Sequence, residues 1–182
     1  MSRRWITITA AVVVAAVLTA GLGLWAGGRV REGRIKTRLA ALTPLIDENA
    51  WRTGVSPDLI RAVIRVESSG DPQAVSSAGA RGLMQITPAA ETDAIKVLNL
   101  PENLKGDLFD PKYNLLIGVT YLAHLRERFD GDDRLALAAY HMGPTAVARL
   151  QREHPDLSSQ QLIDQFAGPQ TRAYVRKVMQ AW

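Results

Sequence analysis

A proline that follows a hydroxyl or carboxyl residue recurs along this chain and marks where helices can begin. Four such pairs occur: Thr43-Pro44, Ser56-Pro57, Thr87-Pro88 and Asp110-Pro111. The side-chain oxygen of the first residue can cap a helix by accepting backbone N–H groups, and proline supplies the backbone angle of the first helical position. The run from Ser158 to Gln161 also has the spacing of a capping box. No stretch alternates between β-branched and polar residues, so the sequence predicts a mainly α-helical fold.

Apolar residues at helical spacing predict where the longer helices run. One helix is expected over residues 111–129, with Gly131 just past its end. Others are expected over residues 134–142 and 171–182. Gly143 and Pro144 close the second of these helices, and together the helices predict a compact, mainly helical domain.

Residues 71–86 differ in amino-acid composition from the rest of the chain. They are rich in glycine and serine and include a proline, which predicts an irregular segment or a short hairpin. Together with the helices they fit one domain over residues 43–182, long enough to bury a core. The chain has no cysteine, so disulfides and thiol chemistry are excluded.

The N-terminal stretch predicts a membrane anchor. Residues 5–26 include no charged side chain, and a helix of that length can cross a hydrocarbon core. Trp5 and Trp25 stand near its ends, where interfacial aromatic residues prefer to lie. We predict a transmembrane helix within residues 1–28, followed by a basic juxtamembrane segment over residues 29–42. A cleaved signal peptide is the alternative, because small residues near position 27 would suit a cleavage site.

The positive charge of the chain is concentrated near its N-terminus. Residues 1–38 hold seven basic side chains and one acidic, whereas residues 39–182 hold 15 basic and 17 acidic. The later part has no basic patch with interleaved aromatic residues, so we predict no nucleic-acid partner. More basic residues follow the apolar run than precede it, which on its own would keep the later part in the cytoplasm.

Glu67 is the strongest candidate for a catalytic group. In the helix predicted after Ser56, the residues three, four and seven positions earlier are Ile64, Val63 and Ile60. These spacings place Glu67 at the end of an apolar stripe. A carboxyl group held against hydrocarbon has a raised pKa, which suits a general acid at neutral pH. Alternatively, Glu67 bends out into water at the helix C-terminus.

Four sequence blocks follow one another in a characteristic order between about Pro44 and Val178. They are Glu67-Ser68-Ser69-Gly70 with the later run Gly79-Ala80-Arg81-Gly82-Leu83-Met84-Gln85-Ile86-Thr87-Pro88; Asp110-Pro111-Lys112-Tyr113-Asn114; Ala138-Ala139-Tyr140-His141-Met142-Gly143-Pro144; and Thr171-Arg172-Ala173-Tyr174-Val175. This ordered set resembles the soluble-lytic-transglycosylase type of peptidoglycan lytic transglycosylase. The resemblance implies the goose-type lysozyme fold, which is mainly α.

The resemblance also implies a reaction. It is cleavage of the β-1,4 bond between N-acetylmuramic acid and N-acetylglucosamine, with Glu67 as the single general acid and base. Glu67 would protonate the leaving oxygen and then take a proton from the 6-hydroxyl of the muramoyl residue. That hydroxyl closes on its own anomeric carbon and leaves a 1,6-anhydro end. No cofactor is implied.

The resemblance assigns five residues to substrate binding. Ser76 and Gln85 resemble polar residues beside the acid, and Met84 resembles a residue of the cleft wall. Tyr140 and Tyr174 resemble tyrosines that reach toward the catalytic carboxyl group. Each also has a plainer interpretation: a solvated loop residue for the two polar ones, a core residue for Met84, and half-buried packing for the tyrosines. Asn114 fits helix packing better than sugar binding.

The acid residues give independent support for a one-carboxylate mechanism. Ordinary glycoside hydrolysis uses two carboxylates flanking the bond. The acid nearest in sequence to Glu67 is Asp71, whose place before a proline suits a turn. Asp107 or Asp132 could still fold close to Glu67, so a lysozyme-like muramidase that hydrolyses the bond stays an alternative.

His141 departs from the family pattern, which usually has asparagine at that position. Imidazole reproduces one hydrogen bond of an amide but not both, so a sugar contact is altered and a pH effect becomes possible. His124 and His154 have no second ligand at metal spacing, and we predict no metal site.

These observations lead to expectations about the substrate of the protein and its location in the cell. We expect peptidoglycan glycan strands as the substrate. We expect the catalytic domain on the periplasmic or extracytoplasmic side of the inner membrane, anchored by the N-terminal helix, or secreted if that segment is cleaved. A further alternative is a weakly active glycan-binding scaffold of an envelope-spanning protein complex.

Overall fold

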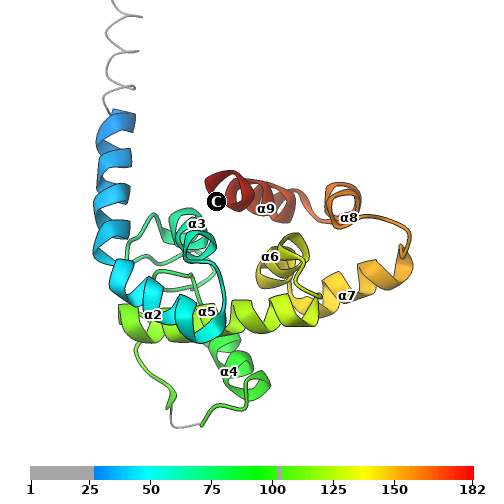
Figure 1. The fold of residues 1–182 in the computed structure, drawn as a ribbon, viewed down its shortest axis with the longest axis horizontal. Coiled ribbons are helices and arrows are strands. Elements are labelled where there is room, and N and C mark those ends of the chain that lie inside the picture. Colours follow the sequence, from blue (N-terminus) through cyan, green and yellow to red (C-terminus); the bar gives the residue numbers. More distant parts are fainter. Residues whose placement is uncertain (1–26, 102–103) are drawn as a thin grey trace, which may run out of the picture. The chain divides into compact units, whose positions relative to one another are not determined.

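The structure, a computed structural model, describes residues 27–101 and 104–182 and is mainly helical (Figure 1). Residues 38–182 form one compact unit, and the residues up to 37 group separately. Residues 27–41 are helical. The helices that follow are α2 Thr43–Thr53, α3 Pro57–Ser68, α4 Pro88–Val97, α5 Pro111–Arg128, α6 Asp133–Met142, α7 Pro144–Glu153, α8 Ser159–Phe166 and α9 Pro169–Ala181.

Three of the four predicted proline-associated caps are confirmed. Ser56 Oγ accepts from the Asp58 N–H at the start of α3, and Thr87 Oγ1 accepts from the Ala90 N–H at the start of α4. Asp110 accepts from two backbone N–H groups at the start of α5. The cap predicted at Thr43 is wrong.

Thr43 lies inside the first turn of α2, and the preceding helical residues fix its backbone. Its hydroxyl donates to the Leu39 carbonyl instead of accepting from the helix start. The capping box predicted at Ser158 and Gln161 is confirmed.

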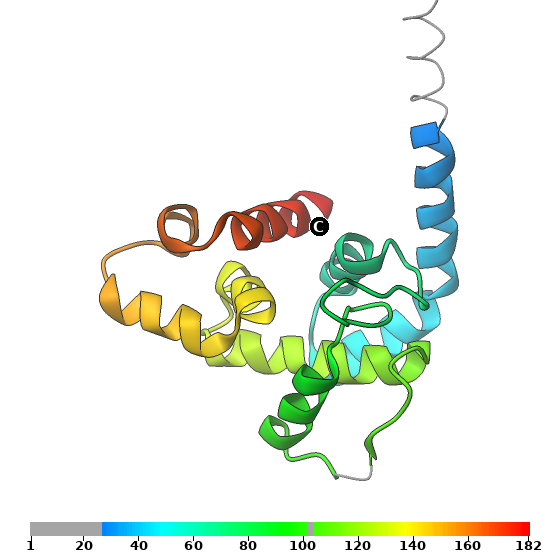
Figure 2. The ribbon, with the colours of Figure 1, turned by 180° about the vertical axis from the view of Figure 1, so that it is seen from behind.

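The core forms where α5 meets the helices on either side of it. α5 packs against α2, α4 and α6, and α6 in turn packs against α7, α8 and α9. α3 contacts α2 and α9, so the helix that carries Glu67 lies beside the last helix of the chain (Figure 2). Leu115, Leu122 and Leu125 of α5 are fully buried, as its helical spacing predicts.

The segment between α3 and α4 is irregular, as predicted for residues 71–86. It contains only the isolated bridges Val75–Arg81 and Arg81–Ile86, so a regular hairpin does not form within it. Its conformation is fixed from α5 by Asn114, which is fully buried. Asn114 accepts from the Met84 N–H at 2.8 Å and donates to the Arg81 and Leu108 carbonyls at 3.0 and 2.8 Å.

Gly82 shows why this segment needs glycine at one point. Its φ is +74°, in the left-handed region, and a side chain there would collide with the Leu108 carbonyl and the Asn114 amide. The amide of Asn114 can therefore reach the backbone of the segment only because residue 82 has no Cβ.

The predicted transmembrane anchor falls almost entirely on residues 1–26, outside the described part of the chain. Within residues 27–101 and 104–182, no helix has both the length and the apolar character needed to cross a membrane.

Candidate active site

Glu67 occupies the last turn of α3, on the helix face that the sequence predicts. Ile60, Val63 and Ile64 of that face are fully buried. The helix ends because Ser69 adopts a left-handed conformation with φ of 56°. Glu67 is thus fixed at the point where the buried helix gives way to the irregular segment.

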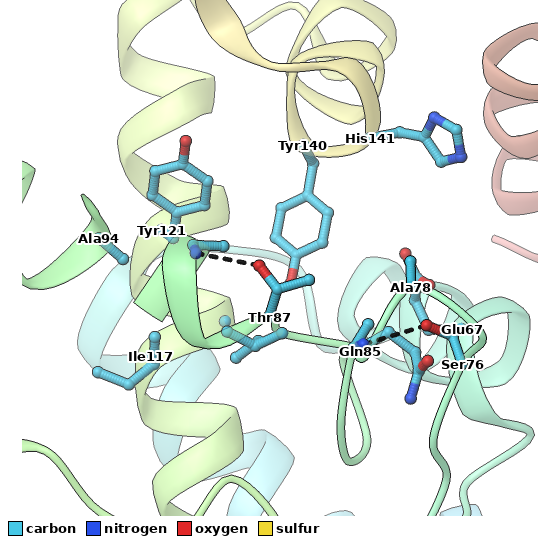
Figure 3. A pocket seen from close by; sticks show the side chains of 14 residues that line it. Glu67, Ser76, Ala78, Gln85, Thr87, Ala94, Ile117, Tyr121, Tyr140 and His141 are labelled. Atoms are coloured by element: carbon cyan, nitrogen blue, oxygen red, sulfur yellow. Dashed lines mark hydrogen bonds between the residues drawn. The ribbon is translucent and has the colours of Figure 1, made fainter. Parts of the chain in front are cut away.

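A cavity of about 380 Å³ lies beside Glu67. Its wall comes from α3, the irregular segment, α4, α5 and α6. The lining residues are Glu67, Ser76, Ala78, Ala80, Gln85, Ile86, Thr87, Ala90, Ala94, Ile117, Gly118, Tyr121, Tyr140 and His141. Figure 3 shows Glu67 and Ser76 toward one end and Tyr121 with Ala94 toward the other, with the Tyr140 ring between them.

Burial raises the pKa of Glu67 from 4.5 to about 7. The nearby Tyr174 hydroxyl opposes this shift, because it stabilises the carboxylate. With a pKa of about 7, protonated and ionised forms are both well populated at neutral pH. The group can therefore serve first as an acid and then as a base.

The two tyrosines occupy different positions relative to Glu67. The Tyr140 hydroxyl donates to the Met84 carbonyl at 3.0 Å, so its hydrogen bond goes to the backbone of the irregular segment and not to the acid. The Tyr174 ring is buried, and its hydroxyl comes close enough to Glu67 to affect the pKa. This oxygen has no partner with full hydrogen-bond geometry in the described part of the chain, so the pair is a near contact.

Burial and the negative charge of Glu67 raise the pKa of both tyrosines well above 10. Both phenols therefore remain protonated over the physiological range. Tyr174 can act on Glu67 only as a hydrogen-bond donor.

Ser76 and Gln85 line the cavity, as predicted, but both also hold the loop together. Ser76 Oγ accepts from the Ala80 N–H at 3.1 Å. Gln85 Nε2 donates to the Ala74 and Gly82 carbonyls, and no group of the described residues donates to its Oε1. The backbone of Gln85 has φ of 50°, a conformation that non-glycine residues adopt rarely.

Met84 does not line the cavity. Its side chain is fully buried and packs so closely on Gly118 that a Cβ there would collide with it. The core interpretation therefore applies to the side chain of Met84. The backbone carbonyl of Met84 is the part that meets the site, through Tyr140.

His141 lines the cavity and connects α6 with α9. Its Nδ1 lies 3.1 Å from Thr171 Oγ1, and its ring stacks on Tyr174 with centroids 4.8 Å apart. Burial lowers the pKa of His141, so the imidazole is neutral at neutral pH. His141 thereby holds the ring of the tyrosine that approaches Glu67.

No second carboxylate lines the cavity among the described residues. Asp71 pairs with Arg38 at 3.1 Å and caps a turn through the Gln73 N–H. Asp132 caps α6, and Asp107 accepts from the Phe109 N–H at 2.8 Å. The three acids that the sequence left open are thus used in turns and caps.

The chain also matches a known protein family. The Transglycosylase SLT domain matches residues 44–163, which is more than half of the chain. The chain belongs to this family.

The relatives of this SLT domain are lytic murein transglycosylases. The chain is 32% identical to the soluble lytic murein transglycosylase of Salmonella typhimurium over 69% of its own length and 20% of that protein. It is 33% identical to the membrane-bound lytic murein transglycosylase C of Histophilus somni over 81% of its length and 46% of that protein. The chain thus spans from about a fifth to less than half of these relatives.

Solved SLT structures confirm the fold. The 70 kDa soluble lytic transglycosylase of Escherichia coli superposes with a TM-score of 0.69 at 27% identity, over 76% of this chain and 23% of that one. A 70 kDa soluble lytic transglycosylase in complex with bulgecin A superposes with a TM-score of 0.68 at 27% identity. The Pseudomonas aeruginosa lytic transglycosylase Slt, as an inactive mutant, superposes with a TM-score of 0.68 at 28% identity.

The sequence did not assign to the site several residues that line the cavity of the SLT domain. Ile117, Gly118 and Tyr121 of α5 all face the cavity. Their spacing from Asn114 is three, four and seven residues, so one face of α5 holds all four. That spacing was the signal that could have found them. The sequence could not predict the contact of Thr171 with His141 from spacing. The two residues lie on different helices, α9 and α6, which come together only in the folded chain.

Proposed function

We propose that this protein cleaves peptidoglycan glycan strands as a lytic transglycosylase, with Glu67 as its single general acid and base. The observation that carries the proposal is an isolated carboxyl group with a pKa of about 7 at one end of a 380 Å³ cavity. The named activity of the relatives supports the same reaction.

The reaction needs one group that gives and then recovers a proton. Protonated Glu67 donates to the glycosidic oxygen, and the N-acetylglucosamine side leaves as an alcohol. The 6-hydroxyl of the muramoyl residue forms a bond to its own anomeric carbon. Its proton passes to the Glu67 carboxylate, which restores the starting state. No water is consumed. The reaction therefore needs no second carboxylate, either as a base that activates water or as a nucleophile.

The other residues of the site orient Glu67 and hold the sugar rings of the substrate. Tyr174 donates toward the ionised form of Glu67 and keeps its pKa from rising further. Tyr121 and Tyr140, with ring centroids 6.0 Å apart, offer apolar faces to sugar rings in the middle and far part of the cavity. The Gln85 Oε1 and the Ser76 hydroxyl can bond sugar hydroxyls or acetamido groups near the acid.

Digestion of purified peptidoglycan by the full chain tests this proposal. Wild type should release fragments with 1,6-anhydromuramoyl ends, and Glu67→Gln should release none. Lys112→Gln, on the exposed side of α5, is the matched control and should behave as wild type. Reducing ends from the wild type would identify a muramidase instead. Binding without turnover at any pH would identify a glycan-binding scaffold.

The same proposal places the catalytic domain outside the cytoplasmic membrane, where peptidoglycan lies. The uncharged run over residues 5–26 supports a retained anchor, and relatives named membrane-bound have similar domains. Protease added to intact spheroplasts should digest residues 39–182. Protection of that part would contradict this location.

A further inference from the structure

A second groove, of about 280 Å³, lies where α6, α8 and α9 meet. None of its lining residues lines the cavity beside Glu67. Three guanidinium groups reach it, from Arg134 of α6 and from Arg172 and Arg176 of α9. Asp164 of α8 is its one carboxylate. The apolar part of the wall comes from Ile163, Val175 and Met179.

Two of the arginines are held by neutral acceptors. Arg134 Nε donates to Gln160 Oε1 at 2.8 Å, and Arg172 Nη1 donates to the Asp164 backbone carbonyl at 2.7 Å. The Asp164 carboxylate accepts from Gln160 Nε2 at 2.6 Å. In the described part of the chain, no ion pair joins any of the three arginines to a carboxylate.

This arrangement leaves the groove with excess positive charge and fixed donors. Three cations face one anion, and the hydrogen bonds of Arg134 and Arg172 orient their guanidinium groups without neutralising them. The planar fork of arginine matches a carboxylate through two parallel hydrogen bonds. With an apolar wall beside these donors, the groove suits a short peptide that has free carboxylates and small apolar side chains.

The groove lies within a short reach of the active-site cavity. Thr171, which precedes Arg172, meets His141 of the cavity wall at 3.1 Å. Arg134 and Tyr140 are six residues apart on α6, or about 9 Å along the helix axis, and their side chains leave the helix about 120° apart. An extended peptide advances about 3.3 to 3.6 Å per residue, so about three residues cover the axial distance and a stem of four or five residues exceeds it.

We propose that this groove binds the free carboxylates of the peptide stems that peptidoglycan carries on its muramoyl residues, while the glycan occupies the cavity beside Glu67. The inference rests on the proposed function and adds a second point of substrate contact. Arg176 is the main anchor, because it is exposed and, among the described residues, forms no side-chain hydrogen bond to another helix.

The test compares two substrates: glycan strands with intact stems, and the same strands stripped of stems by an amidase. Arg176→Gln should lower kcat/KM about fivefold on stem-bearing strands and leave stem-free strands unchanged. Arg134→Gln combined with Arg176→Gln should increase the loss. Lys177→Gln, an exposed cation of α9 outside the groove, should change neither. Equal losses on both substrates, or no loss for the double variant, would overturn the proposal.

A binding measurement separates this inference from the proposed function. The free stem tetrapeptide, titrated calorimetrically into full-length Glu67→Gln, should bind, and Arg176→Gln in that background should weaken it about fivefold. This result does not depend on turnover, so it holds even if the chain cleaves nothing. An unrelated acidic peptide that binds as tightly would overturn the assignment to wall stems and indicate an acidic protein partner.

Discussion

The hydroxyl of Tyr174, on the last helix, approaches the carboxyl group of Glu67 on α3 and lowers its pKa, while burial raises that pKa to about 7. His141 stacks on the same tyrosine ring and bonds Thr171. Burial is thus the main cause of the raised pKa of Glu67, and the hydroxyl of Tyr174, whose ring stacks on His141 of α6, partly offsets it.

Tyr174→Phe should raise the pKa of Glu67 further, because the phenol no longer stabilises the carboxylate. The protonated acid would then persist to higher pH, so the alkaline limb of the pH–rate profile should move upward. The ring is retained, so the free energy of unfolding should change by no more than about 1 kcal/mol. A limb that stays in place or moves downward would show that Tyr174 does not act on Glu67.

Glu67→Gln should stabilise the protein at alkaline pH. The folded-state pKa of about 7 lies above the ordinary 4.5, so the contribution of Glu67 to stability is complete below pH 4.5 and is lost as pH rises through 7. Glutamine stays neutral throughout. Relative to wild type, the free energy of unfolding of the variant should gain about 3 kcal/mol between pH 4 and pH 8. Denaturant titrations of the variant and of wild type at pH 4 and pH 8 measure this gain. If the variant and wild type differed by the same free energy at both pH values, the raised pKa of Glu67 would be contradicted.

Tyr140→Phe should affect stability more than the pH profile. Its hydroxyl donates to the Met84 carbonyl, and the loss of that bond should cost about 1 kcal/mol. The alkaline limb should stay where it is in wild type. A shift as large as that of Tyr174→Phe would mean that both phenols act on the acid.

Asn114→Ala should loosen the segment that forms one wall of the cavity. Three hydrogen bonds to that segment and its surroundings are lost, with buried backbone groups left unpaired, at a cost of about 2 to 4 kcal/mol. Thermal unfolding measures the cost, with the exposed Lys112→Ala on the same helix as the control. Equal melting temperatures for the two variants would contradict the role of Asn114.

His141→Asn should leave the shape of the pH–rate profile above pH 7 unchanged. Burial lowers the pKa of His141 from its ordinary 6.5, so the imidazole is already neutral in that range. Loss of the alkaline limb in this variant would assign that limb to the imidazole and not to Glu67.

Local features of the sequence predicted much of the fold. The caps at Ser56, Thr87 and Asp110 and the buried face of α3 depend on residues within one or two helical turns, so their spacing was enough. Thr43 failed as a cap because the preceding residues are themselves helical, and the dipeptide alone does not reveal that.

Contacts between distant helices could not be predicted in the same way. The stacking of His141 on Tyr174 and the bond from Tyr140 to the Met84 carbonyl depend on how α6 and α9 pack around the irregular segment. Met84 illustrates the limit: a residue beside the catalytic loop in sequence can point its side chain into the core and offer only its backbone to the site.

The most direct test of the central claim is digestion of peptidoglycan in water enriched in oxygen-18, followed by mass spectrometry of the new muramoyl ends. If Glu67 alone moves the proton and the 6-hydroxyl attacks, every new end should be lighter than a reducing end by one water and should contain no label. New ends that contain oxygen-18 would show that water is the nucleophile, and the single-carboxylate mechanism would be wrong.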